Sequence, residues 1–285
     1  RYVTSERRKF MANGLVPDDT FYLNSVRVNE YLLKDHNIND IPLPNEDLTE
    51  LIGITIHNTD DLPEVEDSAE QYTAATIDGD MKDVRVHYYV DDLGAWQNLP
   101  LNSTGWHAAD GDGDGNTKTI AIETIMSSED DPNSLKARDN AARLAAYLLY
   151  ENGLDENDLY THSYWLNVRD GIEGDRDYLN TLPNPYKTCP IYIIPNWYEF
   201  KEQVAGYIDE LKSGEATARF DPYPVEVSVG TLNVRGGPGT DFPVTARINY
   251  GEKYMITDRK SSGGISWGKL DSGAGWVDLQ YTQKV

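Results

Sequence analysis

Three short runs rich in β-branched and aromatic residues constrain the fold of this chain most strongly. Longer polar and helical stretches separate and follow them. The runs are Leu51–Asn58, Val84–Val90 and Thr119–Met126, and polar turns bound each of them, as is typical of β-strands. Helical periodicity covers Ser134–Asn152 and Asn196–Leu211, with Ser134 as the expected N-cap and Gly153 as the stop. This order predicts an α/β domain with a mixed central sheet flanked by helices.

A change in composition after residue 212 predicts a second domain. Residues 213–224 are small, charged and punctuated by proline, which is typical of a linker. Residues 225–285 alternate short apolar runs with Gly-rich turns and have no helical period, so we expect a small all-β barrel or sandwich. Residues 1–50 are mixed and polar, with a basic cluster at 7–9, and we expect an extension that packs on the domain formed by residues 51–212.

The charge balance narrows the class of partner. The 285 residues include 25 Lys and Arg against 48 Asp and Glu, which gives a net charge of −23. Nucleic-acid binding needs the opposite balance, so that class of function is disfavoured. No apolar stretch approaches the ~20 residues that cross a bilayer, and 39% hydrophobic residues are enough for a packed core.

Strand alternation brings three ionisable residues together. If the three runs are neighbours in one sheet, their less apolar sides present His57, His87 and Glu123 on one face. Such groups are costly to bury without partners. Each histidine alone is readily explained as a structural residue, but the coincidence over three strands favours a site.

A second group lies late in the first domain. His162 follows a short apolar run, and Lys187 and Cys189 come about 25 residues later. Cys189 is the single cysteine, so an intramolecular disulfide is excluded. Two imidazoles and a thiolate are a normal Zn²⁺ ligand set with an open fourth position. The alternatives are a nucleophilic thiol, which the nearby lysine would activate, or an inert buried side chain.

Five motifs in consistent order carry a family resemblance. ITIHNT, VHYYVDDLGAWQ, GWHA, GDGDGN followed by TIAIE, and a histidine followed by KTCP resemble the zinc-dependent N-acetylmuramoyl-L-alanine amidases of the type 2 amidase fold. That family includes phage endolysins, bacterial autolysins and peptidoglycan recognition proteins. The resemblance covers about residues 51–211.

The resemblance implies roles for specific residues. One Zn²⁺ ion would be held by His57, His162 and Cys189, and Glu123 and Lys187 would be catalytic. The groove for substrate would be formed by His87, Tyr88, Trp106 and His107. The expected reaction is hydrolysis of the amide between N-acetylmuramic acid and the L-alanine of the stem peptide by a zinc-activated water.

Three features depart from the family pattern or invite another reading. The interval between His162 and Cys189 is long, and we expect its acidic, Tyr-rich insertion to be a surface loop beside the groove. Val86 stands where some relatives carry a catalytic tyrosine, so proton transfer would rest on Glu123. The run Asp110–Asn116 opens like an EF-hand loop, but Ala121 stands at its twelfth position, so we favour a solvated loop over a calcium site.

The C-terminal region resembles a bacterial SH3-like domain through TLNVRGGPGTDFPV and the closing WGKL and GWVDL segments. The resemblance implies cell-wall binding, with Trp267 and Trp276 either contacting the wall or simply filling the core. The expected partner is bacterial peptidoglycan, and the expected location is the extracellular cell wall, after secretion or release at lysis; a monomer is favoured. Two alternatives stay open: a non-catalytic recognition protein of the same fold, and a cell-wall cysteine peptidase that uses Cys189.

Overall fold

The computed structural model describes residues 14–36, 38, 41–59 and 68–285. The first 13 residues of the expected N-terminal extension therefore lie outside the described residues. The chain forms two compact units, one made of residues up to Asp19 and from Val26 to Glu215, the other of Thr20–Ser25 and Ala216–Val285. Within the described ranges, no helix combines the length and apolarity needed to cross a membrane.

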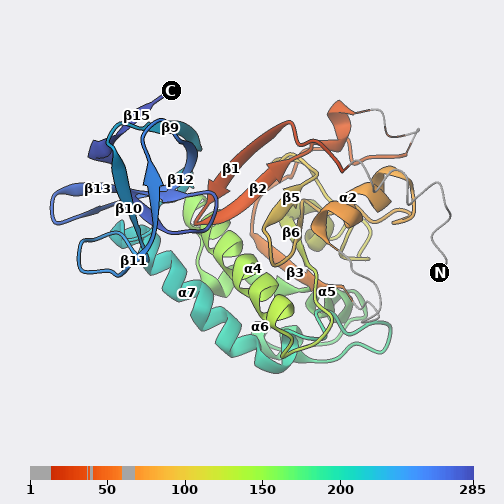
Figure 1. The fold of residues 1–285 in the computed structure, drawn as a ribbon. Helices are drawn as coiled ribbons and strands as arrows, with labels where there is room; N and C mark the ends of the chain where they lie inside the picture. The colour runs from red at the N-terminus through yellow and green to blue at the C-terminus, as the bar shows by residue number, and fades with distance from the viewer. Residues whose placement is uncertain (1–13, 37, 39–40, 60–67) are drawn as a thin grey trace. The chain divides into compact units, whose positions relative to one another are not determined.

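The sheet of the first unit is mixed, as predicted. Strands follow the order β7-β3-β6-β4-β5-β2. Their bounds are Leu159–Thr161 for β7, Gly53–Asn58 for β3, Thr119–Thr124 for β6, Tyr88–Val90 for β4, Ala95–Gln97 for β5 and Val26–Glu30 for β2. β3 runs parallel to β6 and β7, β4 is parallel to β6, and β5 is antiparallel to β4. Figure 1 shows β3, β5 and β6 inside this unit.

The second predicted strand is shorter than expected. Regular pairing begins only at Tyr88, although the apolar pattern starts at Val84. Upstream, Arg85 makes an isolated antiparallel bridge with Trp106. The imidazole Nδ1 of His87 accepts the Ala121 N–H at 3.1 Å. The His87 side chain therefore accepts an N–H that a main-chain carbonyl would accept in a regular ladder. Regular pairing of β4 with β6 consequently starts only after His87.

The helices follow the predicted periodicity, with one corrected boundary. They are α2 (Ala69–Ile77), α3 (Asp114–Lys118), α4 (Pro132–Glu151), α5 (His162–Arg169), α6 (Arg176–Thr181) and α7 (Trp197–Ser213), with 3-10 turns η1 (Leu33–Asp35), η2 (Glu156–Asp158) and η3 (Ile194–Asn196). The expected N-cap of α4 was wrong: Asp131 caps it by accepting the Ser134 N–H at 2.8 Å. Pro132 suits the first helical position, so the helix starts earlier.

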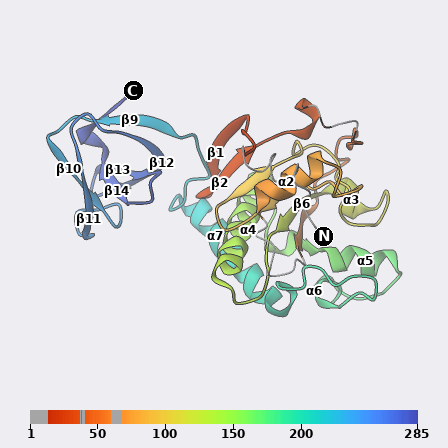
Figure 2. The same ribbon diagram turned by 45° about the vertical axis from the view of Figure 1, so that its right-hand side comes forward.

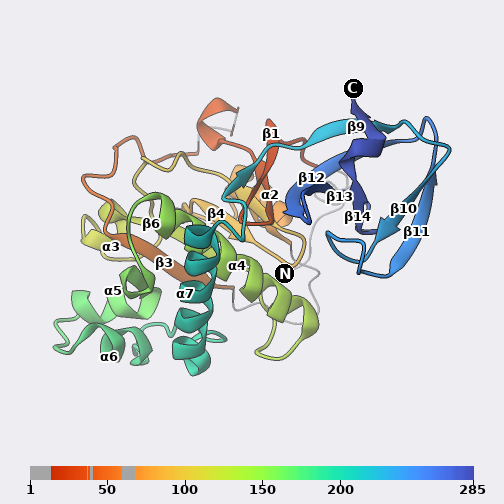
Figure 3. The same ribbon diagram turned by 90° about the vertical axis from the view of Figure 1, so that its left-hand side faces the viewer.

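Helices pack on both faces of this sheet. α4 contacts β3, β4 and β6, and α7 packs along α4, as Figures 1 and 3 show. The buried face of α7 consists of the residues that gave its periodicity: Trp197, Phe200, Val204, Ile208 and Leu211. On the face that carries Thr55 and Ala121, α2 packs Ala69 against Ala121 and Tyr89, and the Trp165 indole of α5 donates to Thr55 Oγ1 at 2.8 Å.

The second unit is all β, and Figure 2 shows it as strands without a long helix. Its antiparallel sheet has the order β11-β10-β14-β13-β12-β9-β15. The bounds are Tyr223–Val227 for β9, Thr231–Arg235 for β10, Val244–Asn249 for β11, Lys253–Ser262 for β12, Ile265–Leu270 for β13, Trp276–Asp278 for β14 and Thr282–Lys284 for β15, with η4 at Leu279–Tyr281.

Two further features complete the second unit. Within the stretch expected to be a linker, β8 (Arg219–Phe220) pairs antiparallel with the end of β1 (Asp19–Leu23). The core contains Leu270 and Val277. Because side chains alternate along a strand, Trp267 and Trp276 lie on the other face of the sheet from these two residues, and both are nevertheless buried.

Candidate metal centre

Two of the predicted site residues face each other across parallel strands. β3 and β6 pair in a register that sets His57 directly beside Glu123. The His57 Nδ1 atom lies 3.9 Å from Glu123 Oε2, and the two side chains are 2% and 14% exposed. Both residues stand near the carboxyl ends of their strands. The predicted neighbourhood of these two residues is therefore confirmed.

Ser163, the residue after His162, holds the segment of Cys189 next to that of His162. His162 begins α5 directly after β7, and Thr161 caps that helix by accepting the Tyr164 N–H at 3.0 Å. The Ser163 N–H donates to the Cys189 carbonyl at 2.8 Å, and the Cys189 N–H donates to Ser163 Oγ at 3.0 Å. This reciprocal pair fixes Cys189 beside the start of α5, although 27 positions separate the two ligands in the sequence.

The three residues converge as a ligand group. One ligand atom each from His57, His162 and Cys189 lies within 4.8 Å of the others, and all three side chains are buried. Cys189 Sγ is 3.8 Å from His57 Nδ1. Both ring nitrogens of His162 are buried without a hydrogen-bond partner among the described residues. Buried imidazole nitrogens normally have partners, so this donor set is consistent with a metal ion.

Burial keeps the histidines of the site neutral, the form that binds metals. Desolvation, with smaller contributions from His162 and His107, holds the pKa of His57 well below its ordinary value. Desolvation and then the Lys187 ammonium lower the pKa of His162 to about 3. Lys187 is exposed, and its effect on both imidazoles places its positive charge within electrostatic range of the centre.

His107 has a position that sequence reasoning did not foresee. Its Nδ1 lies 3.1 Å from His57 Nε2, on the side of the His57 ring away from Cys189. Because His107 is 95% buried, it contacts His57 from inside the protein. The resemblance had placed this residue in the substrate groove, and only the tertiary structure shows its bond to His57.

The Asp/Gly-rich loop supports His107. Asn116 Oδ1 accepts the main-chain N–H groups of His107 and Ala108, each at 2.8 Å. The carboxylate of Asp110 accepts the Gly115 N–H at 2.8 Å and the Asn116 N–H at 3.3 Å. Both Asp110 oxygens are thereby used inside the loop. The loop acts as a scaffold for the chain around His107.

The remaining groove residues are mostly internal. His87 and Tyr88 are fully buried. The His87 ring contacts the Ser103 carbonyl through Nε2 at 2.9 Å and the Ala121 N–H through Nδ1, and the Tyr88 hydroxyl donates to Gln97. Trp106 is half-buried. A substrate contact by His87 would therefore require one of its present hydrogen bonds to break.

The long insertion between His162 and Cys189 contains a helix rather than the expected surface loop. Asn180 of α6 is fully buried beside β7. Its Oδ1 accepts the Thr161 N–H at 2.7 Å, its Nδ2 donates to the Leu159 carbonyl at 3.3 Å, and its own carbonyl accepts from Thr161 Oγ1 at 2.9 Å. Since β7 is the last strand at this side of the sheet, the carboxamide replaces a missing neighbouring strand and holds the residue that precedes His162.

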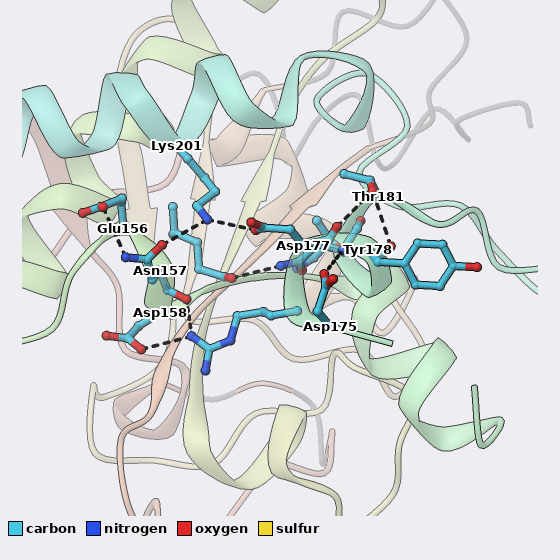
Figure 4. A network of polar contacts seen from close by, with 12 residues as sticks. Glu156, Asn157, Asp158, Asp175, Asp177, Tyr178, Thr181 and Lys201 are labelled. Carbon is cyan, nitrogen blue, oxygen red and sulfur yellow. Dashed lines mark hydrogen bonds and ion pairs between the residues drawn. The ribbon is translucent and has the colours of Figure 1, made fainter. Parts of the chain in front are cut away.

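Charged contacts fasten α6 to its surroundings. Lys201 of α7 donates to Asp177 at 2.9 Å and to Asn157 at 3.3 Å. Arg176 forms an ion pair with Asp158 at 3.2 Å. Figure 4 shows these groups between α6, α7 and the turn before β7. Because these pairs are partly exposed, each contributes little stability alone; together they tie the insertion to α7 and to η2.

Two family models match this chain, one in each unit. Residues 48–189 match the family model described as N-acetylmuramoyl-L-alanine amidase, and residues 230–283 match the bacterial SH3 domain. Two amidases of Bacillus subtilis strain 168 are each 31% identical: XlyA over 54% of this chain and 44% of its own length, and CwlH over 50% and 59%. The solved catalytic domain of XlyA superposes with a TM-score of 0.49 at 28% identity, covering 62% of this chain and 98% of that one.

The chain thus spans about half the length of the curated relatives that it matches. The family match covers β3 to Cys189, which includes all three members of the buried ligand group. The second match falls within the all-β unit. Residues 48–189 are therefore an N-acetylmuramoyl-L-alanine amidase domain, and a bacterial SH3 domain follows it in the chain.

Proposed function

We propose that this protein is a zinc-dependent N-acetylmuramoyl-L-alanine amidase that cleaves the amide between the lactyl group of N-acetylmuramic acid and the first L-alanine of the stem peptide. The observation that carries the proposal is the buried group of His57, His162 and Cys189, with Glu123 beside it. The family match over the same residues supports the reaction type.

The donor set favours zinc among the common metals. Thiolate and imidazole suit Zn²⁺, whereas Ca²⁺ and Mg²⁺ prefer oxygen ligands. When bound by these three side chains, the ion would act as a Lewis acid toward the scissile carbonyl and activate water. His107 orients the His57 ring, since its Nδ1 is placed to accept a hydrogen bond from His57 Nε2.

Glu123 and Lys187 supply the remaining chemistry. The Glu123 carboxylate lies beside His57 and is 14% exposed, so it can accept a proton from water at the centre and return it to the departing amine. The Lys187 ammonium, two residues before Cys189, would stabilise negative charge on the carbonyl oxygen of the substrate. Val86 is buried at the position where some relatives have a tyrosine, which leaves Glu123 as the proton carrier.

A cysteine peptidase is the second candidate, since Cys189 Sγ lies 3.8 Å from His57 Nδ1. The side chain of Cys189 is 99% buried, however, and a nucleophile must reach its substrate. His162 with two unpartnered nitrogens is explained by a metal ion and plays no part in a Cys–His dyad. Inhibition by a chelator and recovery with Zn²⁺ supports the amidase; insensitivity to chelators supports the peptidase.

The bacterial SH3 domain supports action at the cell wall. A module that binds the wall would raise the local concentration of the catalytic unit on an insoluble substrate. We therefore propose bacterial peptidoglycan as the partner of both units and the wall as the place of action. Trp267 and Trp276 are only 2% and 9% exposed, which favours packed side chains of this domain over wall contacts at these two positions.

The decisive experiment combines metal analysis with mass spectrometry of digested peptidoglycan. The purified protein should contain one zinc ion per chain and release stem peptides with a free L-alanine amino terminus from sacculi. Cleavage of a different bond would contradict the reaction, and full activity without metal would contradict the metal centre. Wall binding without any cleavage would instead identify a recognition protein.

A further inference from the structure

The side chain of Tyr186 is exposed to solvent, although hydrogen bonds hold the main chain that carries it. Tyr186 is 72% exposed, compared with 60% for Tyr198 and 48% for Tyr178. Its main-chain N–H donates to Asn184 Oδ1 at 2.8 Å, and Asn184 is itself 96% buried. The Asn184 amide donates to Asn167 and Asp170, each at 3.0 Å. The base of Tyr186 is therefore fixed, while its ring stands in solvent.

The ring has one occupied face. The guanidinium carbon of Arg169 lies 5.3 Å from the centroid of the Tyr186 ring, a cation–π contact. Arg169 is held in turn by the Asp170 carboxylate at 2.9 Å and by the Ala109 carbonyl at 3.2 Å. These contacts restrict the ring and leave its other face free to receive a ligand. A held aromatic ring that stays in solvent does not contribute its burial free energy to folding. That free energy remains available for binding a ligand.

Tyr186 and Arg169 are close in sequence, or bonded, to the segments that carry the candidate metal centre. Tyr186 stands three residues before Cys189, so their Cα atoms are at most ~11 Å apart. Arg169 ends the helix that His162 begins, a rise of about 10 Å. The Ala109 carbonyl that accepts from Arg169 follows His107 by two residues. The pair therefore lies beside the segments that carry the ligand group.

We propose that the free face of Tyr186 binds the sugar ring of the N-acetylmuramoyl group during hydrolysis, as a specificity-determining contact of the amidase. This inference rests on the proposed function. The sugar is joined through its lactyl group to the carbonyl that is attacked, so it must lie a few bonds from the centre. The C–H face of a pyranose ring packs on an aromatic ring, and the tyrosine hydroxyl and remaining Arg169 donors can bond to its hydroxyl and acetamido oxygens.

Local charge favours the sugar over the stem peptide as occupant. The segment that leads to Tyr186 carries four acids, of which Asp170 is paired with Arg169 and Asp177 with Lys201. A stem peptide bears free carboxylates, which the other two acids, Glu173 and Asp175, would repel. The muramoyl sugar is uncharged once its lactyl carboxyl is in amide linkage. The Arg169 charge is already paired with Asp170, so it offers little compensation to an anionic ligand.

The test compares two soluble substrates with the full chain loaded with zinc. One is an N-acetylmuramoyl-peptide, and the other is the same peptide acylated by D-lactic acid alone, which has the scissile amide but no sugar. Tyr186→Ala should raise KM for the sugar substrate ~10-fold with kcat little changed, because a contact made equally in ground and transition states is lost. The same variant should cleave the lactyl substrate at the rate of the unmodified protein.

The matched variants make the outcomes distinct. Tyr186→Phe keeps the ring and should retain most of the affinity for the sugar substrate. Tyr250→Ala removes a comparably exposed tyrosine, 70% exposed, from the other unit, and it should leave KM and kcat for both substrates unchanged. Equal loss on both substrates would overturn the sugar contact and point to the peptide or to a damaged site. If the unmodified protein cleaves neither substrate, the proposed function fails rather than the sugar contact.

Discussion

The His57 ring lies between two partners: its Nδ1 is 3.8 Å from Cys189 Sγ, and its Nε2 is 3.1 Å from His107 Nδ1. A neutral imidazole carries one proton, so the His57 proton belongs on Nε2, donated to His107, when Nδ1 serves as the ligand atom. His107 therefore selects the tautomer of His57 that presents a lone pair to a metal ion.

Replacement of His107 should weaken metal binding. His107→Phe keeps a ring of similar size but leaves the Nε2 proton of His57 without an acceptor, and loss of such a partner typically lowers metal affinity ~10–100-fold. Competition with a chromophoric chelator measures the change. His36→Gln, at a histidine bonded to Asp18, is the control and should bind zinc normally. Unchanged affinity in His107→Phe would refute the orienting role.

Glu123→Gln should separate metal binding from turnover. The amide keeps the size of the side chain but cannot accept a proton, so kcat should fall ~10²–10⁴-fold. Zinc content should stay near one ion per chain, because the ligand group does not include this residue. Metal analysis and a turbidity assay on sacculi are run on the same preparation. Substantial residual activity would transfer the proton-carrying role to another group.

Asn180→Ala should destabilise the edge of the sheet. The change leaves the Thr161 N–H and the Leu159 carbonyl without their side-chain partner, and unsatisfied buried groups cost about 1–3 kcal/mol each. We expect a loss of unfolding free energy of that order in a denaturant titration, together with weaker zinc binding because His162 follows Thr161. Asn157→Ala, at an exposed asparagine, should change stability by less than about 0.5 kcal/mol.

Acid should destabilise the metal-free protein through His87. Burial lowers the pKa of His87 to about 4 from 6.5. Between these values the unfolded chain binds a proton at this residue and the folded chain does not, so stability falls as the pH drops, by up to about 1.4 kcal/mol per pH unit. His87→Gln should show a shallower loss between pH 6.5 and 4.5 in denaturant titrations. An unchanged slope would contradict this assignment.

Calcium should not stabilise the Asp110–Asn116 loop. Both Asp110 carboxylate oxygens already accept main-chain N–H groups, so the carboxylate is held in place by the loop itself and needs no Ca²⁺ ion to order it. We expect the same Tm with Ca²⁺ as without it. Asp110→Ala should lower Tm, since two hydrogen bonds to a carboxylate are lost, whereas Asp112→Ala, at an exposed neighbour, should not. A rise of Tm with Ca²⁺ would restore the calcium interpretation.

The sequence by itself determined the α/β class, the strands β3, β4 and β6 with the helices α4 and α7, and the nearness of His57 and Glu123. These follow from local periodicity: alternation decides which side of a strand a residue takes, and the apolar spacing of α7 matches its buried face. The ligand trio also came from sequence, but from ordered motifs, since no spacing rule joins His57 to His162 and Cys189.

Only the tertiary structure decided how these residues are supported. The pairing of His107 with His57, the closure of the β7 edge by Asn180, and the stacking of Arg169 on Tyr186 all join segments that no periodic pattern relates. The helix inside the insertion was missed because it spans only six residues, too short for a helical period to emerge. Such contacts depend on long-range packing and specific hydrogen bonds, which exist only once the chain has folded.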